Sequence, residues 1–281
     1  MKKLNDSGTT RIEHIDGVDI VRFTPLEKYD FFEAAFSTRI GGVSEGEYSS
    51  MNLSFTRGDA KENVSENFRR MAKALKVNMS DMIMTHQTHT VNVAVADSIK
   101  KGTGITREYD YSDIDGFVTD EENMVLVTSY ADCVPVFFAD PVKKVIASSH
   151  SGWRGTVGNI SKNTVELMKK TYSSNPKDIL AFIGPSICKN CYEVGKDVAE
   201  EFEKAYTGEE CETVLTPKTD GKYLLDLHAA NRFNLINSGL LPENIFVTDI
   251  CTSCNSDVLF SHRKTQGRRG GMCGFIWKKR L

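Results

Sequence analysis

The stretch that decides the fold is residues 123–155, NMVLVTSYADCVPVFFADPVKKVIASSHSGWRG. It holds three apolar runs, at Asn123 to Tyr130, Val134 to Ala139 and Val145 to Ser149, separated by short polar segments. Short apolar runs between turn signals are typical of buried strands. We therefore predict three neighbouring strands, followed by a Gly-rich turn at Ser151 to Gly155.

Strands and helices are predicted on both sides of this centre. Apolar runs and alternation predict strands at Val18 to Phe23, Phe31 to Thr38, Met82 to Val95, Ile179 to Ile183, Ile245 to Val247 and Cys273 to Trp277. Helical spacing of apolar residues predicts helices at Lys61 to Lys76, Thr156 to Tyr172, Gly195 to Ala205 and Leu225 to Ser238. This mixture predicts an α/β (α+β) fold, with mixed β-sheets flanked by helices. Because no Pro- or Ser-rich linker divides the chain, we expect one layered domain over residues 1–281.

Composition excludes several classes of protein. The 281 residues carry 35 Lys and Arg against 38 Asp and Glu, a net charge of -3, which argues against binding nucleic acid by charge. Apolar runs such as Val134 to Ala139 are far shorter than the ~20 residues that span a bilayer. Residues 1–8 carry two lysines without an apolar stretch behind them, unlike a signal peptide. We expect a cytoplasmic protein whose seven cysteines are reduced and serve as metal ligands, nucleophiles or core residues.

Cys133 and His150 are the first candidates for chemistry. Cys133 begins one predicted strand and His150 ends the next, so the two side chains face each other if these strands pair. In one interpretation Cys133 is a nucleophile and His150 its base. In another both bind zinc, with His89 or His86 as third ligand and an open fourth position. A buried cysteine and a hydrogen-bonded histidine without chemical function fit the spacing equally well.

Two further features are alternatives of their own. Cys188 and Cys191, with Cys251 and Cys254, form two C-x-x-C pairs that would suit a structural zinc, although the stretch between the pairs is longer than the roughly 15–20 residues of usual zinc ribbons. The turn at Ser151 to Gly155 precedes a predicted helix, where free N–H groups and Arg154 would attract an anion such as phosphate. The plain alternatives are an ordinary tight turn, and reduced thiols that lie near one another or are unrelated.

Several segments together resemble one family, the laccase-domain or multicopper polyphenol oxidoreductase family, which includes peptidoglycan-editing factors and purine nucleoside phosphorylases. The resemblance extends from about Phe36 to Trp277. The matching segments are Ser37-Thr38-Arg39, Gly41-Gly42-Val43-Ser44, Asn52-Leu53, Gln87-Thr88-His89, Ala131-Asp132-Cys133-Val134-Pro135, His150-Ser151-Gly152-Trp153-Arg154-Gly155, Gly184-Pro185-Ser186-Ile187, Cys191-Tyr192-Glu193-Val194-Gly195, Asp226-Leu227, Asn231, Ser261-His262-Arg263 and Gly267-Arg268.

The resemblance implies a metal centre. It implies zinc, or alternatively copper, bound by His89, Cys133 and His150; family members often have Gly after the first ligand, where this chain has Thr90. His86 remains a rival because it lies three residues from His89. Residues 86 and 89 of a strand point to opposite faces, so we expect at most one of them to bind. The implied fold is a layered α/β domain similar to the catalytic domain of a bacterial cysteine deamidase toxin, which keeps a metal-free Cys133–His150 pair open.

The resemblance also implies a small-molecule purine nucleoside enzyme. The expected reactions are phosphorolysis of adenosine, inosine and methylthioadenosine, and deamination of adenosine. Cys133, His150 and Asp132 are the expected catalytic residues, Asp132 either as general base or as the partner of a ligand histidine. The expected substrate-binding residues are Arg39, Asn52, Arg154, His262 and Arg268.

Alternatives remain at this point. They are an amidase that removes L-Ser from a UDP-MurNAc precursor of the cell wall, a copper polyphenol oxidase, and a non-catalytic binding module stabilised by zinc on the four late cysteines. The sequence does not indicate an oligomeric state.

Overall fold

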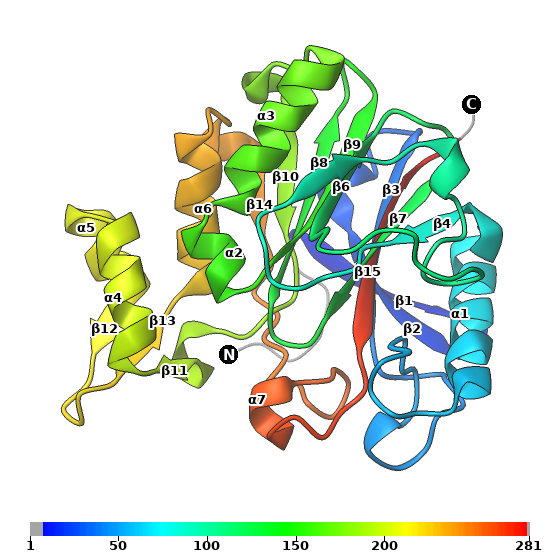
Figure 1. The fold of residues 1–281 in the computed structure, drawn as a ribbon, viewed down its shortest axis with the longest axis horizontal. Helices are drawn as coiled ribbons and strands as arrows, with labels where there is room; N and C mark the ends of the chain where they lie inside the picture. Colours follow the sequence, from blue (N-terminus) through cyan, green and yellow to red (C-terminus); the bar gives the residue numbers. More distant parts are fainter. Residues whose placement is uncertain (1–7, 280–281) are drawn as a thin grey trace.

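The computed structural model describes residues 8–279 and has two six-stranded sheets and one three-stranded sheet among them (Figure 1). The expectation about a leader rests on the first residues of the chain, of which 1–7 lie outside the described part. No helix within residues 8–279 combines the length and apolar character that crossing a membrane requires.

The first sheet contains both the beginning and the end of the described chain. Its strand order is β1-β2-β3-β15-β7-β4, with β4 parallel to β7 and the other neighbours antiparallel. Its strands are β1 (Thr10–Ile15), β2 (Val18–Phe23), β3 (Phe32–Ser37), β15 (Met272–Lys278), β7 (Val125–Tyr130) and β4 (Met82–Met84).

The second sheet positions the candidate residues Cys133 and His150. Its order is β14-β10-β8-β9-β6-β5, in which β10–β14 and β5–β6 are parallel pairs and the rest are antiparallel. Its strands are β14 (Ile245–Val247), β10 (Leu180–Ile183), β8 (Val134–Asp140), β9 (Val145–Ser151), β6 (Gly116–Thr119) and β5 (Val93–Val95). A small third sheet contains β11 (Glu193–Val194), β13 (Tyr223–Leu225) and β12 (Leu215–Pro217).

Helices cover the outer faces of the two large sheets. Figure 1 shows α1 on one side and α3 with α6 on the other. The α-helices are α1 (Lys61–Leu75), α2 (Trp153–Val157), α3 (Ile160–Tyr172), α4 (Lys196–Ala205), α5 (Gly208–Val214), α6 (Leu227–Asn237) and α7 (His262–Thr265). The 3-10 turns are Thr24–Leu26, Gly46–Tyr48, Met79–Asp81, Ser98–Lys100, Pro176–Asp178, Lys189–Cys191 and Pro242–Asn244.

Three apolar layers explain why the central strands are apolar throughout. Phe137 of β8 points between the two sheets, towards Phe36, whereas the next residue, Phe138, points to the helix side of its sheet. A third layer packs Phe68 of α1 against the outer face of the first sheet. Because both faces are covered, all seven residues of β8 are buried. The predicted α/β class, with mixed sheets flanked by helices, is confirmed.

Two predicted elements are wrong in their continuity. The strand predicted at Met82 to Val95 is two strands, β4 and β5, which belong to different sheets, so the chain between them crosses from one sheet to the other. The helix predicted at Thr156 to Tyr172 begins earlier, at Trp153, and is interrupted at Asn159, which has a φ of 58° and accepts a hydrogen bond from the Lys162 N–H. The spacing of apolar residues predicts neither the break between β4 and β5 nor the break at Asn159.

Candidate metal centre

Two adjacent strands of the second sheet position Cys133 and His150. Cys133 directly precedes β8, and His150 is the penultimate residue of β9, where it is paired in register with Pro135. The antiparallel pairing therefore brings two residues 17 positions apart to one end of the sheet. His150 is buried, while Cys133 is partly exposed.

His89 reaches the same place from the segment that crosses between the sheets. It has a φ of 64°, so the backbone bends sharply at this residue. Its Nε2 lies 4.0 Å from the Cys133 Sγ, and the rings of His89 and His150 are 4.9 Å apart between centroids. The three potential ligand atoms all lie within 4.8 Å of one another.

A buried carboxylate, Asp115, organises this group, and sequence reasoning missed it. Its oxygens accept hydrogen bonds from the backbone N–H groups of Thr88, His89 and Thr90, at 3.2, 3.1 and 2.9 Å, and from the Thr90 hydroxyl at 2.8 Å. The His150 Nδ1 lies 2.8 Å from Asp115 Oδ1, which leaves Nε2 of this ring for the ligand position. Asp115 thus fixes both the loop that carries His89 and the ring of His150.

Electrostatics favour a thiolate at Cys133. Burial alone would raise the pKa of Cys133, but the His150 and His89 imidazoles outweigh it and lower this pKa to about 6. Burial would likewise lower the pKa of His150, but the Cys133 sulfur and Asp115 raise it to about 9. A thiolate beside two imidazoles is a nitrogen and sulfur donor set of the kind zinc prefers.

The space among the three side chains exists because residue 152 is a glycine. A Cβ on Gly152 would lie 3.1 Å from the Cys133 Sγ and 3.0 Å from Cδ2 of His89. His89 is exposed, so the group reaches solvent on one side. Three ligands with one accessible side fit a metal that keeps a coordination position for substrate.

A group of basic residues, Arg57, His262 and Arg269, lies near Cys133, and we call it the basic rim. Arg269 is buried, with 8% exposure, and its Nε has no hydrogen-bond partner among the described residues. Burial and the neighbouring Arg57 lower the pKa of Arg269 to about 10, while Asp132 and Cys133 oppose this shift. Tyr192 lies there too: burial, and then the charge of Cys133, raise its pKa to about 12. A buried guanidinium with an unused donor is suited to an anion.

The Asp132 carboxylate contacts two later loops, whereas the carboxylate at His150 belongs to another residue. Its carboxylate accepts hydrogen bonds from the Thr252 hydroxyl and the Arg263 N–H, both at 2.6 Å, and its φ is 87°. It therefore ties the residue before Cys133 to two later loops. The carboxylate that contacts His150 is Asp115.

The other predicted residues are divided between the rim and the framework. Arg39 donates to the carbonyls of Ser49 and Ser256, and its guanidinium lies over the Phe260 ring. Asn52 is buried and binds Asp59 and the Gly271 N–H, so it holds loops together. Arg154 is exposed and stacks on Trp153, and α2 is only five residues long.

At the C-terminal loop, His262 and Arg268 are both exposed, and Arg269 is the buried arginine. Burial and Arg269 lower the pKa of His262, which places His262 on the basic rim. The rival ligand His86 packs edge-on against Tyr109, with ring centroids 4.8 Å apart, and is not among the three clustered ligand residues.

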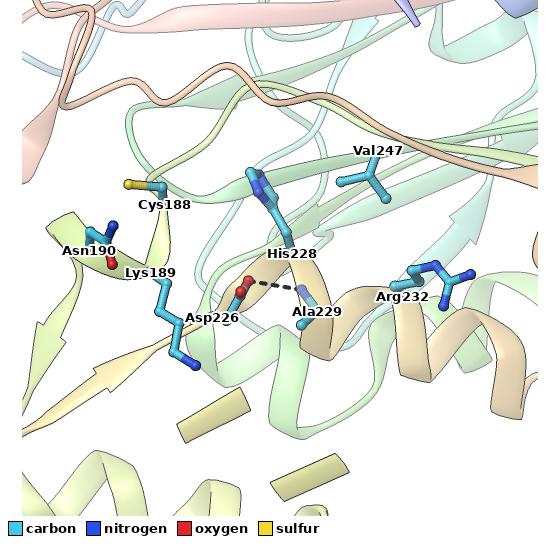
Figure 2. A pocket seen from close by; sticks show the side chains of 8 residues that line it. All are labelled: Cys188, Lys189, Asn190, Asp226, His228, Ala229, Arg232 and Val247. Atoms are coloured by element: carbon cyan, nitrogen blue, oxygen red, sulfur yellow. Dashed lines mark hydrogen bonds between the residues drawn. The ribbon is translucent and has the colours of Figure 1, made fainter. Parts of the chain in front are cut away.

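The four late cysteines also come together. The sulfurs of Cys188, Cys191, Cys251 and Cys254 lie within 4.8 Å of one another, at a second location. A cavity of about 300 Å³ lies beside Cys188 and is lined by Asp226, His228 and Arg232 among others. Figure 2 shows the Cys188 sulfur pointing away from His228 in this view. None of His89, Cys133 and His150 lines this cavity.

Comparison with known proteins identifies the family. The profile of the multi-copper polyphenol oxidoreductase laccase family matches residues 33–279. The chain belongs to this family. Among its relatives, purine nucleoside phosphorylase YlmD of Bacillus subtilis is 36% identical over 248 residues, which cover 88% of each chain. A protein named adenosine deaminase RL5, from an unknown prokaryotic organism, is 37% identical over 261 residues, 90% of this chain and 99% of that protein.

A solved crystal structure shares the fold of this chain. The crystal structure of the hypothetical protein YfiH from Bacillus licheniformis superposes with a TM-score of 0.90 at 31% sequence identity, covering 96% of this chain and 99% of that one. The family resemblance drawn from the sequence motifs is therefore confirmed.

Proposed function

We propose that this protein is a metal-dependent purine nucleoside enzyme, which splits adenosine, inosine and methylthioadenosine with phosphate and also deaminates adenosine. The observation that carries the proposal is the clustering of His89, Cys133 and His150, with His89 exposed to solvent; the buried Arg269, which has an unused donor, lies within electrostatic range of Cys133. The names of the relatives YlmD and RL5 support the substrate class.

The three ligand residues are suited to Zn²⁺. A Zn²⁺ ion bound there would supply a Lewis acid at an open coordination position. Two histidines and a cysteine also serve blue copper centres, but phenol oxidation by a multicopper enzyme needs several copper sites. Within residues 8–279 the only other clustered ligand group consists of four cysteines without histidine. We therefore favour zinc over copper.

Phosphorolysis requires a phosphate held against the ribose. A phosphate oxygen bonds to the anomeric carbon as the bond to the purine nitrogen breaks, and the purine leaves with its electron pair and takes up a proton. We assign phosphate binding to the basic rim, led by Arg269 with Arg57 and His262 beside it. Fixed cations hold the anion while positive charge develops on the ribose.

Asp115 acts in this proposal as a positioning residue. Its hydrogen bonds to the Thr88–Thr90 segment and to the His150 ring keep both imidazoles aimed at one point before substrate arrives. Such fixed geometry reduces the reorganisation that the reaction requires. Asp132 holds the backbone beside Cys133 through Thr252 and Arg263, and we propose it as a second positioning residue.

The test is direct product analysis. The zinc-loaded enzyme is incubated with inosine with and without phosphate, and separately with adenosine. We expect hypoxanthine and ribose 1-phosphate only when phosphate is present, and inosine with ammonia from adenosine. If the zinc-loaded enzyme forms neither the phosphorolysis products nor the deamination products, the proposal is overturned. Release of free L-Ser from a UDP-MurNAc precursor would favour the amidase instead.

A further inference from the structure

Two loops bring the four late cysteines together. Cys188 precedes the short turn Lys189–Cys191 after β10 and Cys191 ends it, whereas Cys251 and Cys254 lie in the segment after β14. Because β10 and β14 are parallel neighbours, their following segments leave the same edge of the sheet. The contact continues beyond the strands, where Ser186 pairs with Cys251.

The geometry of the sulfurs suits one tetrahedral ion. Four sulfurs at ~2.3 Å from a central zinc lie about 3.8 Å from one another. Here all four lie within 4.8 Å of one another, and the sulfurs of Cys191 and Cys254 are 3.2 Å apart. The Cys188 N–H points at the Cys251 sulfur at 3.3 Å, a hydrogen bond that would stabilise a thiolate.

We propose that Cys188, Cys191, Cys251 and Cys254 bind one Zn²⁺ in a closed, structural site, separate from the centre at Cys133. On binding, each thiol gives up its proton to solvent and its sulfur bonds to the metal, so no oxidant or reductant is needed. Four thiolates fill the tetrahedral shell and leave no position for substrate. The inference does not depend on the proposed function.

The site would brace the protein beside the catalytic strands. Ile187 donates its N–H to the Asp132 carbonyl, and Thr252 donates its hydroxyl to the Asp132 carboxylate. Both donors lie next to cysteines of the four-thiol cluster. The metal would therefore connect two loops, 63 positions apart, that hold the residue preceding Cys133. A fixed cross-link between such loops stabilises the fold most where neither strands nor long helices order the backbone.

The decisive experiment counts zinc in the full-length protein, purified under reducing conditions without added metal. We compare the wild type with the double variant Cys191→Ser/Cys254→Ser, and use Cys211→Ser as the matched control, because Cys211 is a free cysteine outside both clusters. We expect the double variant to hold one zinc fewer per chain than the wild type, and the control to hold the same number. An unchanged zinc content in the double variant would overturn the proposal. So would a loss of iron instead of zinc relative to the wild type.

A second measurement on the wild type remains decisive if the double variant fails to fold. Cysteines are alkylated before and after chelation and located by mass spectrometry. We expect Cys188, Cys191, Cys251 and Cys254 to resist alkylation until the metal is removed. Rapid alkylation of all four before chelation, or a Cys191–Cys254 disulfide in the purified protein, would contradict a tetrathiolate zinc site.

Discussion

The centre at Cys133 and the four-cysteine cluster use similar donors for different ends. The first has three ligand residues, of which His150 is buried and His89 exposed. The second has four sulfurs, from which we infer a closed shell. The comparison teaches that the missing fourth ligand, more than the donor type, separates a place for substrate from a place for cross-linking.

The two groups also differ in what holds their ligands. Cys133 and His150 stand at the ends of paired strands, and Asp115 fixes the histidines through its hydrogen bonds. The four cysteines lie on loops that meet through the Cys188 N–H to Cys251 sulfur contact, the Cys191–Cys254 sulfur contact and backbone pairing around Ser186. Hydrogen bonds to a buried carboxylate hold the ligands of the first centre, whereas the ligands of the second are carried by two loops that the proposed ion would join.

The largest expected effect comes from Cys133→Ala. We expect the variant to lose metal at the three-ligand centre and turnover to fall by more than about 100-fold, because a ligand counts for more than the residues that support it. Nucleoside turnover and zinc content are measured together. His86→Phe is the matched control: it changes the nearby histidine that packs on Tyr109, and its zinc content is expected to equal that of the wild type. Full activity in Cys133→Ala would contradict the assignment of the three-ligand centre to substrate chemistry.

The double variant Cys191→Ser/Cys254→Ser tests the opposite side. A site filled at about 1,000 times its dissociation constant stabilises the fold by ~4 kcal/mol. We therefore expect a melting temperature lower by about 10 °C. Thermal unfolding is followed by circular dichroism, and turnover is measured well below the transition. A variant that melts like the wild type but loses turnover would reverse the roles assigned to the two regions.

Asp115→Asn is expected to weaken the open centre without removing a ligand. The amide cannot accept all the hydrogen bonds that the carboxylate takes from Thr90 and His150. Metal affinity should fall by about 10–100-fold, measured by competition with a chelating dye. Asp113→Asn, at an exposed carboxylate that binds the Thr88 hydroxyl, is the control and should retain wild-type affinity. Equal affinities in both variants would remove Asp115 from its assigned role.

The smallest effect concerns the link between the two regions. Thr252→Val removes the hydrogen bond to Asp132 and should cost about 1 kcal/mol of the free energy of unfolding. Metal content at both sites should stay unchanged. Thr248→Val is the matched control, because the Thr248 hydroxyl is buried without a hydrogen-bond partner among the described residues and its loss should not destabilise the fold. Urea unfolding of both variants checks the difference.

Sequence patterns predicted the strands because both faces of each central strand are buried, which makes Val134 to Ala139 apolar throughout. They also placed Cys133 and His150 at facing strand ends. His89 was preferred to His86 only through the family resemblance, since its position depends on a chain crossing between sheets. Asp115 was missed because nothing local marks a carboxylate that collects backbone N–H groups from a segment some 25 positions away.

Two other features depend on contacts between distant segments, which the sequence does not show. The distance along the chain between the C-x-x-C pairs argued against a shared site, but the parallel pairing of β10 and β14 removes that distance. Arg268 and Arg269 are neighbours in a basic run, and composition cannot tell which side chain turns inward. The structure buries Arg269 and leaves Arg268 exposed.

The most direct test of the central claim is a crystal structure of the purified enzyme with anomalous diffraction recorded on both sides of the zinc absorption edge. We predict a zinc peak bonded to His89 Nε2, Cys133 Sγ and His150 Nε2, with its remaining position turned to solvent or substrate. Zinc-loaded crystals without an anomalous zinc peak among these three residues, or a zinc closed off by a fourth protein ligand, would contradict this prediction.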